Sequence, residues 1–418
     1  MTASAEGRAA ALAAAVQARR DQLLATSHYI HAHPEVRFTE HLASARLAEE
    51  LQAGGFTVEL GVGTLPTAFR AELRGAAPGP TVAILAEYDA LPEIGHACGH
   101  NIIASSALGA GLALAQAGGP FAGTVLVLGT PAEEGGGGKV ILAENGLFDD
   151  VDAAIMVHPS QHNMVSRGSL AHSFVEIVFH GRASHAAAAP DQGVNALEAV
   201  MMTFAGLNAR RLHMRSDARV HGFINNGGSA VNIIPGLASA RFSVRAKDRA
   251  YQRELVEILT AVARGAETMI GARLELNETR GYEHMVSNEA IASVMGRHLQ
   301  NLGRSITPPT SEDRLGSTDM GDISQLMPAV HAYLAIAPQG VANHTIEFTA
   351  LAGSEVGDTA VMDGATSLAQ TALDVLTSPG LLEQAKAEYE AQRERGTVAG
   401  RAAWLEHGKQ FAPVNRNI

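Results

Sequence analysis

The stretch TVAILAEYDALPEIGHACGH, residues 81–100, holds the clearest information on the architecture of this chain. Its first residues, 81–85, are apolar or small, as expected for an interior β-strand that is covered on both faces. A loop with acids, imidazoles and a thiol follows, and a helix is predicted after it at residues 102–116. A strand, a polar loop and a helix in this order predict an α/β layer that binds ligands at the carboxyl ends of its strands.

Similar segments lie on both sides of this stretch. Apolar runs at residues 56–60, 123–128 and 152–157 predict further strands, and the last two are almost wholly apolar. Residues 42–51 and 289–303 carry apolar side chains at helical spacing. Because strands that alternate with helices form mainly parallel sheets, the predicted fold class is α/β with a mainly parallel sheet.

The pattern changes near residue 170. Residues 174–179 and 238–245 resemble strands with one solvated face, and helices are predicted at 196–211 and 251–270. The order β-α-β-β-α-β predicts a smaller inserted α+β domain of ferredoxin-like type. The predicted segments are 1–170 and 286–418 for the larger domain and 171–285 for the inserted one.

Bulk composition excludes several classes of protein. The chain has 418 residues and a net charge of −12, which argues against a nucleic-acid surface. It has one cysteine, so an intramolecular disulfide is impossible. The longest apolar stretch, residues 102–115, is too short to span a bilayer, and residues 1–20 lack the pattern of a signal peptide. We therefore expect a cytoplasmic protein without a membrane partner.

The thiol of Cys98 and the imidazole of His100 are separated by one glycine, which lets both donors face one ion. Thiolate and imidazole ligands suit Zn, Co, Ni or Mn ions. Taken alone this motif is a weak signal, because a lone cysteine is more often a small buried core residue.

Two further strand ends carry side chains of the same kind. Glu133 and Glu134 follow the predicted strand 123–128 and precede four glycines, and His158 follows the strand 152–157. The acids could instead form a solvated turn, and the histidine could be a core residue with satisfied hydrogen bonds. Three successive strands that each deliver a Cys, His or Glu to one edge of a sheet favour a metal site.

These motifs resemble the metal-dependent amidohydrolases and metallopeptidases of the family that includes aminoacylase, carboxypeptidase G, hippurate hydrolase and plant auxin-conjugate hydrolases. The similarity is greatest to the branch of aminobenzoyl-glutamate hydrolase and β-alanyl-lysine-type dipeptidase. It covers nearly the whole chain, from IHAHPE at residues 30–35 to GSTDMGDIS at residues 316–324. It implies a zinc-peptidase-like catalytic domain and an inserted domain that serves as lid and dimerisation domain.

The resemblance implies a set of metal ligands that hold one or two divalent ions, Zn, Mn, Co or Ni. The implied ligands are Cys98, His100, Glu134, His158 and His344. Cys98 stands where other branches have a bridging aspartate. Glu133 matches the general base of the family, and Asp89 matches the acid that supports a metal ligand or water.

The resemblance also implies functional residues in the inserted domain. His185 matches a histidine that reaches an active site, commonly that of the partner subunit, so a homodimer is expected. Asn232 and Arg245 match the region that binds the substrate carboxylate. Without the family motif, His185 would be read as a histidine of a surface loop and Arg245 as part of a solvated strand face.

The expected function is hydrolysis of the amide bond in a small N-acyl or aroyl amino acid or dipeptide. Asn101 and residues 316–324 depart from the auxin-conjugate type, which argues against a plant-hormone or hippurate substrate. Two alternatives stay open: hydrolytic deamination of a small aromatic compound on the same metal site, and a metal-binding homologue without catalytic activity.

Overall fold

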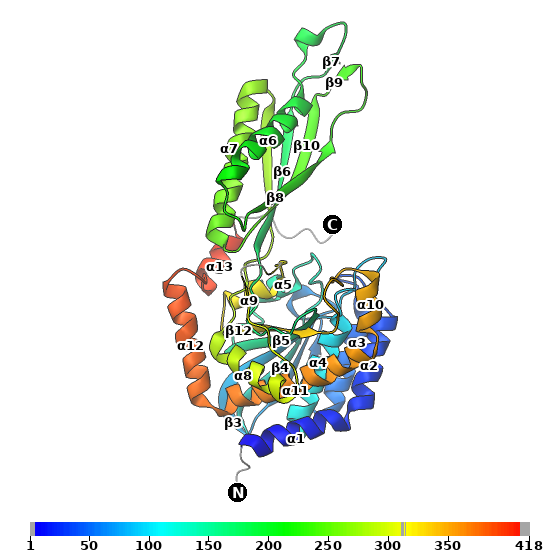
Figure 1. Cartoon of the computed structure of the whole chain (residues 1–418), viewed down its shortest axis with the longest axis vertical. Coiled ribbons are helices and arrows are strands. Elements are labelled where there is room, and N and C mark those ends of the chain that lie inside the picture. Colours follow the sequence, from blue (N-terminus) through cyan, green and yellow to red (C-terminus); the bar gives the residue numbers. More distant parts are fainter. Residues whose placement is uncertain (1–4, 311–312, 314, 410–418) are drawn as a thin grey trace. The chain divides into compact units, whose positions relative to one another are not determined.

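The computed structural model describes residues 5–310, 313 and 315–409, which form two compact units (Figure 1). Within the described residues, the first unit comprises 5–168, 285–310, 313 and 322–405. The second unit comprises 169–284, 315–321 and 406–409.

A six-stranded sheet forms the centre of the first unit. Its strands are β1 (Thr57–Leu60), β2 (Phe69–Arg74), β3 (Ala77–Ala86), β4 (Ala122–Gly129), β5 (Ala153–Ser160) and β12 (Ala329–Ala335). Their order is β1-β2-β4-β3-β5-β12. Strands β4, β3, β5 and β12 pair in parallel, while β1 and β2 are antiparallel at one edge. The sheet is therefore mainly parallel, which confirms the predicted α/β class.

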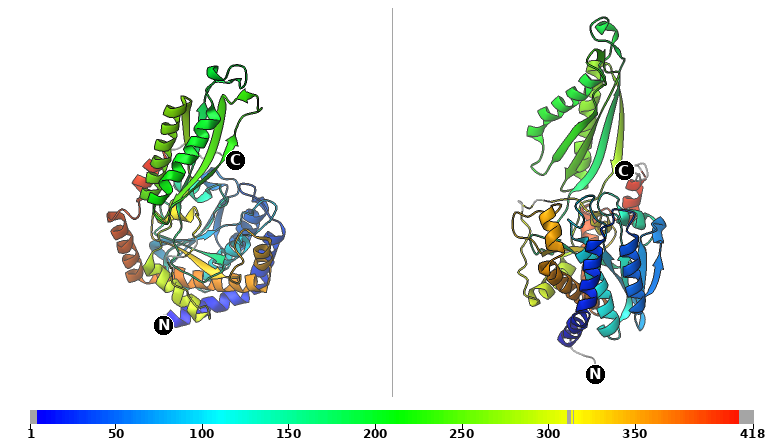
Figure 2. Two further views of the ribbon diagram at one scale, coloured as in Figure 1. Left: turned by 45° about the horizontal axis from the view of Figure 1, so that its top comes forward. Right: turned by 90° about the vertical axis from the view of Figure 1, so that its right-hand side faces the viewer.

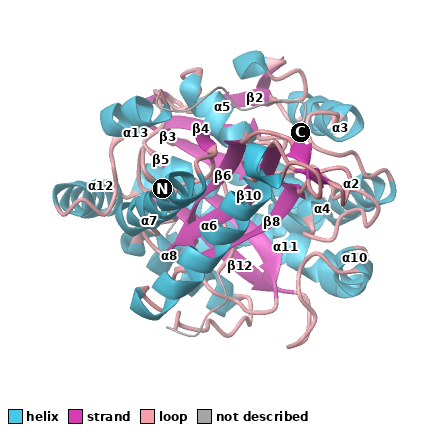
Figure 3. Ribbon diagram, turned by 90° about the horizontal axis from the view of Figure 1, so that it is seen from above, coloured by secondary structure: helices cyan, strands magenta, loops and turns pink. Residues whose placement is uncertain are grey.

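Helices cover this sheet because its central strands are apolar on both faces. The helices of the first unit are α1 (Ala5–Ala18), α2 (Arg20–Ala32), α3 (His41–Ala53), α4 (His100–Ala117), α5 (Gly138–Glu144), α8 (Glu289–Asn301), α10 (Ile346–Ala352), α11 (Glu355–Thr377) and α12 (Pro379–Glu394), with the 3₁₀ turn Val62–Thr64. Helices α9 (Met320–Ser324) and α13 (Arg401–Gly408) have residues in both units. Helices α4 and α11 pack against each other and against β3 and β5. Helix α12 packs on α8 and lies on the outside of the first unit (Figure 3). Among the described residues, no helix combines the length and apolar character needed to cross a membrane.

The second unit is a four-stranded antiparallel sheet with two helices on one face (Figure 2). Its elements are β6 (Ala171–His180), β7 (Ser184–His185), α6 (Ala196–Arg210), β8 (Arg219–Asn226), β9 (Ile233–Ile234), β10 (Leu237–Ala246), α7 (Arg249–Ile270) and β11 (Arg273–Arg280), with 3₁₀ turns at Pro190–Gln192 and Arg211–His213. The strand order is β11-β6-β10-β8, and β7 and β9 form a separate pair.

The division of the chain differs from the predicted segments by one or two residues at each end of the inserted segment, and more substantially at two other places. Residues 315–321 and 406–409 were expected in the larger domain, but they group with the second unit. The backbone N–H of Leu170 donates to the Gly316 carbonyl at 2.8 Å, and Arg253 contacts His407. These contacts between segments distant in sequence account for the difference. Residues 1–4, 311, 312, 314 and 410–418 of the predicted segments lie outside the described residues.

Candidate metal centre

The polar side chains predicted at the strand ends gather at the carboxyl edge of the first unit's sheet. The loop after β3 leads through Cys98 to α4, which begins at His100. Between them, Gly99 has a left-handed backbone (φ 75°), and a Cβ atom there would lie 2.4 Å from Pro159. Only glycine fits this turn, so both the backbone conformation and the close packing require it.

Cys98 lies at the middle of the centre. Its Sγ is 3.6 Å from Nε2 of His158 and 3.5 Å from Nε2 of His344. Nδ2 of Asn343 donates to the same sulfur at 3.7 Å. His344 has a left-handed backbone (φ 66°), unusual for a residue other than glycine, and its N–H donates to the Ala97 carbonyl at 2.9 Å. The chain is thus held in a restricted conformation that brings this distant histidine to the thiol.

Asp89 connects two of the predicted ligands. Its Oδ1 is 3.0 Å from Nδ1 of His100, and its Oδ2 accepts the backbone N–H of Glu134 at 2.9 Å. A carboxylate on Nδ1 of a histidine fixes the ring so that Nε2 presents its lone pair to a metal. Asp89 therefore contacts the side chain of one predicted ligand and the backbone of another.

Three groups of side chains among the described residues bring metal-binding atoms within 4.8 Å of one another. They are Cys98 with His100 and His158, Cys98 with Glu134 and His344, and His100 with Glu133 and Glu134. The structure thus brings together all five predicted ligands and the predicted base. Because Cys98 belongs to two of the groups, its sulfur faces two sets of ligands.

Buried atoms without hydrogen bonds indicate where a cation fits. Nε2 of His100 and Oε1 of Glu134 are buried, and neither has a hydrogen-bond partner. Oε1 of Glu134 lies 3.2 Å from Nε2 of His344 without hydrogen-bond geometry. Leaving such atoms unpaired is costly, whereas an ion between them satisfies both. With sulfur, imidazole and carboxylate donors, the residues fit a divalent transition metal.

The surroundings shift the pKa values of these side chains. Burial alone raises the pKa of the Cys98 thiol, but the histidines around it, His158 above all, lower it well below its ordinary value. Burial and the Cys98 charge raise the pKa of Glu134 against the effect of His344. Contacts with Cys98 and Glu134 raise the pKa of His344 to about 10. Since the thiolate is the form that ligates metals, these neighbours favour that role for Cys98.

A fully buried ion pair beside the centre was not predicted. Nζ of Lys139, on α5, donates to Oε1 of Glu87 at 2.5 Å, and both side chains have no exposed surface. Oε2 of Glu87 lies 3.5 Å from Nε2 of His100. The pair links the loop after β3 to the helix that follows β4. A lysine next to four glycines carries no sequence signal for burial.

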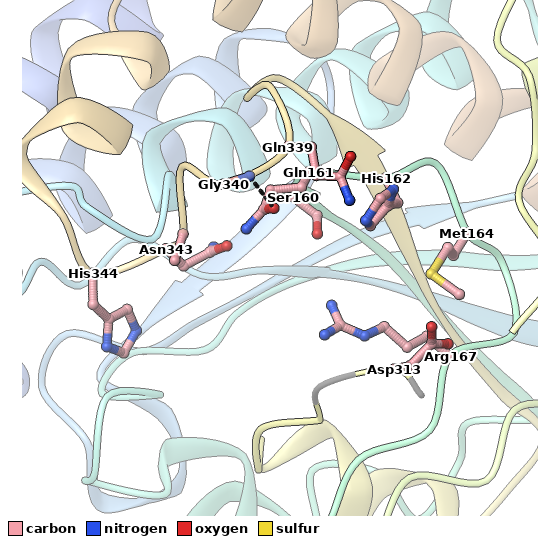
Figure 4. A pocket seen from close by; sticks show the side chains of 11 residues that line it. Ser160, Gln161, His162, Met164, Arg167, Asp313, Gln339, Gly340, Asn343 and His344 are labelled. Atoms are coloured by element: carbon pink, nitrogen blue, oxygen red, sulfur yellow. Dashed lines mark hydrogen bonds between the residues drawn. The ribbon is translucent and has the colours of Figure 1, made fainter. Parts of the chain in front are cut away.

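A cavity of about 620 Å³ in the first unit opens beside His344 (Figure 4). Most of the residues that line it have polar side chains: Ser160, Gln161, His162, Met164, Arg167, Asp313, Gln339, Gly340, Ala342, Asn343 and His344. Figure 4 shows the Arg167 guanidinium pointing into the cavity. The same guanidinium stacks on the Tyr333 ring, 4.8 Å from its centroid. The cavity therefore offers charged and hydrogen-bonding groups next to one of the predicted ligands.

His185 and Asn232 both belong to the second unit. They are exposed and lie close together. His185, in β7, accepts the backbone N–H groups of Ala187 and Ala188 at Nδ1, at 3.3 and 3.1 Å. The carbonyl of Asn232 accepts the N–H of Ala186 at 2.9 Å. Because Nδ1 is an acceptor, the neutral ring carries its proton on Nε2 and presents a donor at its exposed tip.

Arg245 lies near the opposite end of β10 from Asn232. Its Nε donates to Oγ of Ser243 at 3.1 Å and its Nη1 to Oγ of Ser317 at 3.4 Å. Asn232 precedes the first residue of β10, Leu237, and a strand rises about 3.3 Å per residue, so the two sites are separated by more than roughly 20 Å. One small substrate cannot contact both residues from the same chain.

Comparisons with known proteins show relatives that are similar to this chain in sequence and solved structures that are similar in fold. Residues 83–390 match the model of peptidase family M20/M25/M40. Mouse Xaa-Arg dipeptidase is 38% identical over 402 residues, which covers 92% of this chain and 92% of the mouse protein. One of the subunits of p-aminobenzoyl-glutamate hydrolase from Escherichia coli K12 is 27% identical and covers 90% of this chain and 93% of that protein. These relatives include the branch that the sequence motifs suggested.

Solved structures support the same fold. A dinuclear metal-binding peptidase of family M20 from Bacillus subtilis has a TM-score of 0.69 at 21% identity, covering 86% of this chain and 99% of that one. The aminobenzoyl-glutamate utilization protein of Klebsiella pneumoniae has a TM-score of 0.67 at 20% identity, covering 87% and 98%. On the family match and the mouse relative, the chain belongs to peptidase family M20/M25/M40.

Proposed function

We propose that this chain hydrolyses the amide bond of a dipeptide or a small N-acyl or aroyl amino acid, with Glu133 as general base. Members of its family are metal-dependent hydrolases, and the chain is one of them. The observation that carries the proposal is the position of Cys98 in two ligand groups, with Glu133 and Glu134 beside His100. A base and a divalent cation in one place are what amide hydrolysis requires.

Each residue of the centre has its own role in the proposed reaction. Cys98, His100, Glu134, His158 and His344 hold one or two divalent ions. When bound, such ions polarise the scissile carbonyl and lower the pKa of the attacking water. Glu133 takes a proton from that water and returns it to the leaving nitrogen. Asp89 holds the His100 ring and the Glu134 backbone so that both face the ions.

The second unit completes the site in this proposal. His185 offers its Nε2–H to the oxyanion of the tetrahedral intermediate, and Asn232 or Arg245 binds the substrate carboxylate. We propose that a homodimer forms through the second unit. Strand β8 supports this, since it lies at a sheet edge and exposes Phe223 and Ile224. The separation of Asn232 from Arg245 also favours sites shared by two chains.

The cavity beside His344 favours a polar or charged substrate group over a large aromatic one. Arg167 and Asp313 supply charges of both signs, and Gln161, Gln339 and Asn343 supply amides. A similar relative is named for dipeptides ending in arginine, which have charged groups at both ends. We therefore favour a dipeptide over an indole or benzoyl conjugate.

Product analysis tests the proposed reaction. Metal-free protein is loaded separately with Mn, Zn, Co and Ni and offered dipeptides, aroyl-glutamates and N-acyl amino acids. We expect a free amino acid to appear in stoichiometric amount with the second product. Ammonia without an amino acid would favour deamination instead. A fully metal-loaded protein that turns over no substrate of the panel would favour the non-catalytic alternative.

Mixed dimers test whether two chains share a site. His185→Ala and Glu133→Gln are each expected to be inactive as pure proteins. If His185 acts across the dimer, mixing them should restore up to about a quarter of wild-type activity, because a mixed dimer has one site with both native residues. The readout is activity after unfolding and refolding the mixture. Activity no higher than that of the separate variants would contradict sharing.

A further inference from the structure

Glu40 is a fully buried acid that the proposed chemistry does not use. Its side chain has no exposed surface, although it sits at the start of α3, where acids are usually solvated. Its Oε1 accepts two backbone N–H groups, those of Phe38 and Ala132, each at 2.9 Å. Its Oε2 accepts the hydroxyl of Thr67 at 2.8 Å. Both oxygens of the carboxylate thus accept hydrogen bonds, and the side chain does not cap α3, the helix that it precedes.

The two amides that share Oε1 belong to residues in an unfavourable backbone conformation. Phe38 and Ala132 have φ values of 64° and 62°, the left-handed region that residues other than glycine rarely adopt. Such a conformation persists only where its surroundings hold it. The bonds to Glu40 are side-chain contacts that hold both residues, and Ala132 stands directly before Glu133.

The segment that carries Glu40 holds the loop after β4 at a second point. Nη1 of Arg37 donates to the carbonyl of Glu134 at 3.2 Å. The Phe38 ring also packs there, since a Cβ atom on Gly136 would lie 2.8 Å from its Cζ. The peptides on both sides of Glu133 and Glu134 are therefore fixed by residues 37–40, which are distant in sequence.

We propose that Glu40 is a positioning residue for Glu133: by holding the left-handed peptide of Ala132, it aims the base at the attacking water. The inference rests on the proposed role of Glu133. Burial, and secondly the charge of Asp89, raise the pKa of Glu40 to about 7, so an uncharged side chain of the same shape is compatible with the site. The hydrogen-bond geometry, rather than the charge, is what Glu133 needs.

Substitutions at Glu40 test this. Glu40→Gln keeps a carbonyl oxygen for both backbone N–H groups and an amide for Thr67, so kcat should stay within about threefold of wild type. Glu40→Ala removes the acceptor, and a base displaced by about 1 Å should lower kcat about 100-fold with little change in KM or metal content. Equal kcat values for Glu40→Ala and wild type, per metal-loaded site, would overturn the proposal.

A second substitution separates positioning from stability. In Glu40→Ala, changing Ala132 to Gly removes the penalty of the left-handed conformation and should recover about tenfold in kcat. The matched control is Glu35→Ala, because Glu35 lies in the same segment but its carboxylate accepts the N–H groups of Leu42 and Ala43 in α3 rather than that of Ala132. It should lower stability and leave kcat unchanged. A loss of kcat in this control equal to that of Glu40→Ala would reduce Glu40 to a general structural residue.

Hydrogen exchange supplies a readout that does not depend on turnover. The Ala132 amide should exchange at least about tenfold faster in Glu40→Ala than in Glu35→Ala, and unchanged protection would contradict the proposal. If Glu40→Ala does not fold, Glu40→Asp takes its place. The shorter side chain should give a smaller loss of kcat and a smaller increase in the exchange rate of the Ala132 amide. Activity in Glu133→Gln would refute the assigned base, whereas an inactive Glu133→Gln beside a fully active Glu40→Ala would refute only the role of Glu40.

Discussion

Replacing Glu133 with Gln should lower kcat about 10²- to 10⁴-fold, the usual contribution of a general base. The amide of Gln has nearly the same shape as the carboxylate but cannot take a proton from water at neutral pH. Glu133 is buried, at 8% exposure, and lies in one ligand group with His100 and Glu134, so the effect should come from proton transfer. Bound metal should equal that of the wild type. The measurement is steady-state hydrolysis with metal analysis of the same samples.

An exposed acid of the neighbouring loop provides the matched control. Glu93→Gln makes the same chemical change in the loop after β3, on a side chain that is exposed. It should leave kcat and metal content unchanged. If Glu133→Gln keeps more than about a tenth of wild-type activity, the base must be sought elsewhere; if it loses metal as well, Glu133 is a ligand instead.

Replacing Cys98 with Ala should weaken metal binding by more than about 100-fold, because loss of outer-shell partners alone typically costs 10- to 100-fold. The thiol lies 3.6 and 3.5 Å from the Nε2 atoms of His158 and His344, in two ligand groups at once. Its removal takes one ligand from each group and one negative charge from a buried site. The measurement is competition with a chelator, with the metal-to-protein ratio determined after dialysis.

Cys98→Asp tests whether a bridging anion is the essential property. The resemblance that identified the site places an aspartate at this position in other branches. A carboxylate offers two oxygens to the same two ligand groups, so this variant should bind metal more tightly than Cys98→Ala. If Cys98→Ala bound as much metal as the wild type, the sulfur would not be a ligand.

Elements with strong local patterns agree closely with their predictions. The predicted helices 102–116 and 251–270 correspond to α4 (His100–Ala117) and α7 (Arg249–Ile270). The predicted strand 81–85 is the apolar part of β3, whose earlier residues are exposed. Burial of a side chain on a regular element produces a periodic pattern, and such a pattern can be read without a structure.

Four strands of the two larger sheets were given no residue range by the sequence, although the predicted order β-α-β-β-α-β includes a strand at the place of β8 and another at the place of β11. The four are β2, β8, β11 and β12. Strand β11 reads RLELNETR and β8 reads RVHGFINN, with polar or charged residues on much of their length, since each lies at an edge of its sheet. An edge strand pairs on one side only and needs few apolar residues, so it leaves little pattern. Strand β12, AVHAYLA, has an alanine-rich sequence that suits a helix equally well.

By itself, the sequence determined the α/β class, the edge of the sheet that bears the site and most of its donors. Cys98, His100, Glu133, Glu134 and His158 all come close after or at the ends of parallel strands. The carboxyl ends of such strands meet at one edge whatever else the chain does, so their neighbourhood follows from the local pattern.

No local sequence pattern predicts the remaining contacts, which only the tertiary structure forms, although the family resemblance names His344 as a ligand together with Cys98. The tertiary structure brings His344 to Cys98 across 246 positions in sequence, and Lys139 to Glu87 across 52. It also places Glu40 under the left-handed peptide of Ala132, 92 positions away. The members of each pair lie on different loops or helices, Lys139 on α5 and Glu40 at the start of α3, so no single strand or helix pattern relates them. The energy of such contacts depends on burial and on hydrogen bonds between distant segments, which leave no periodic pattern in the sequence.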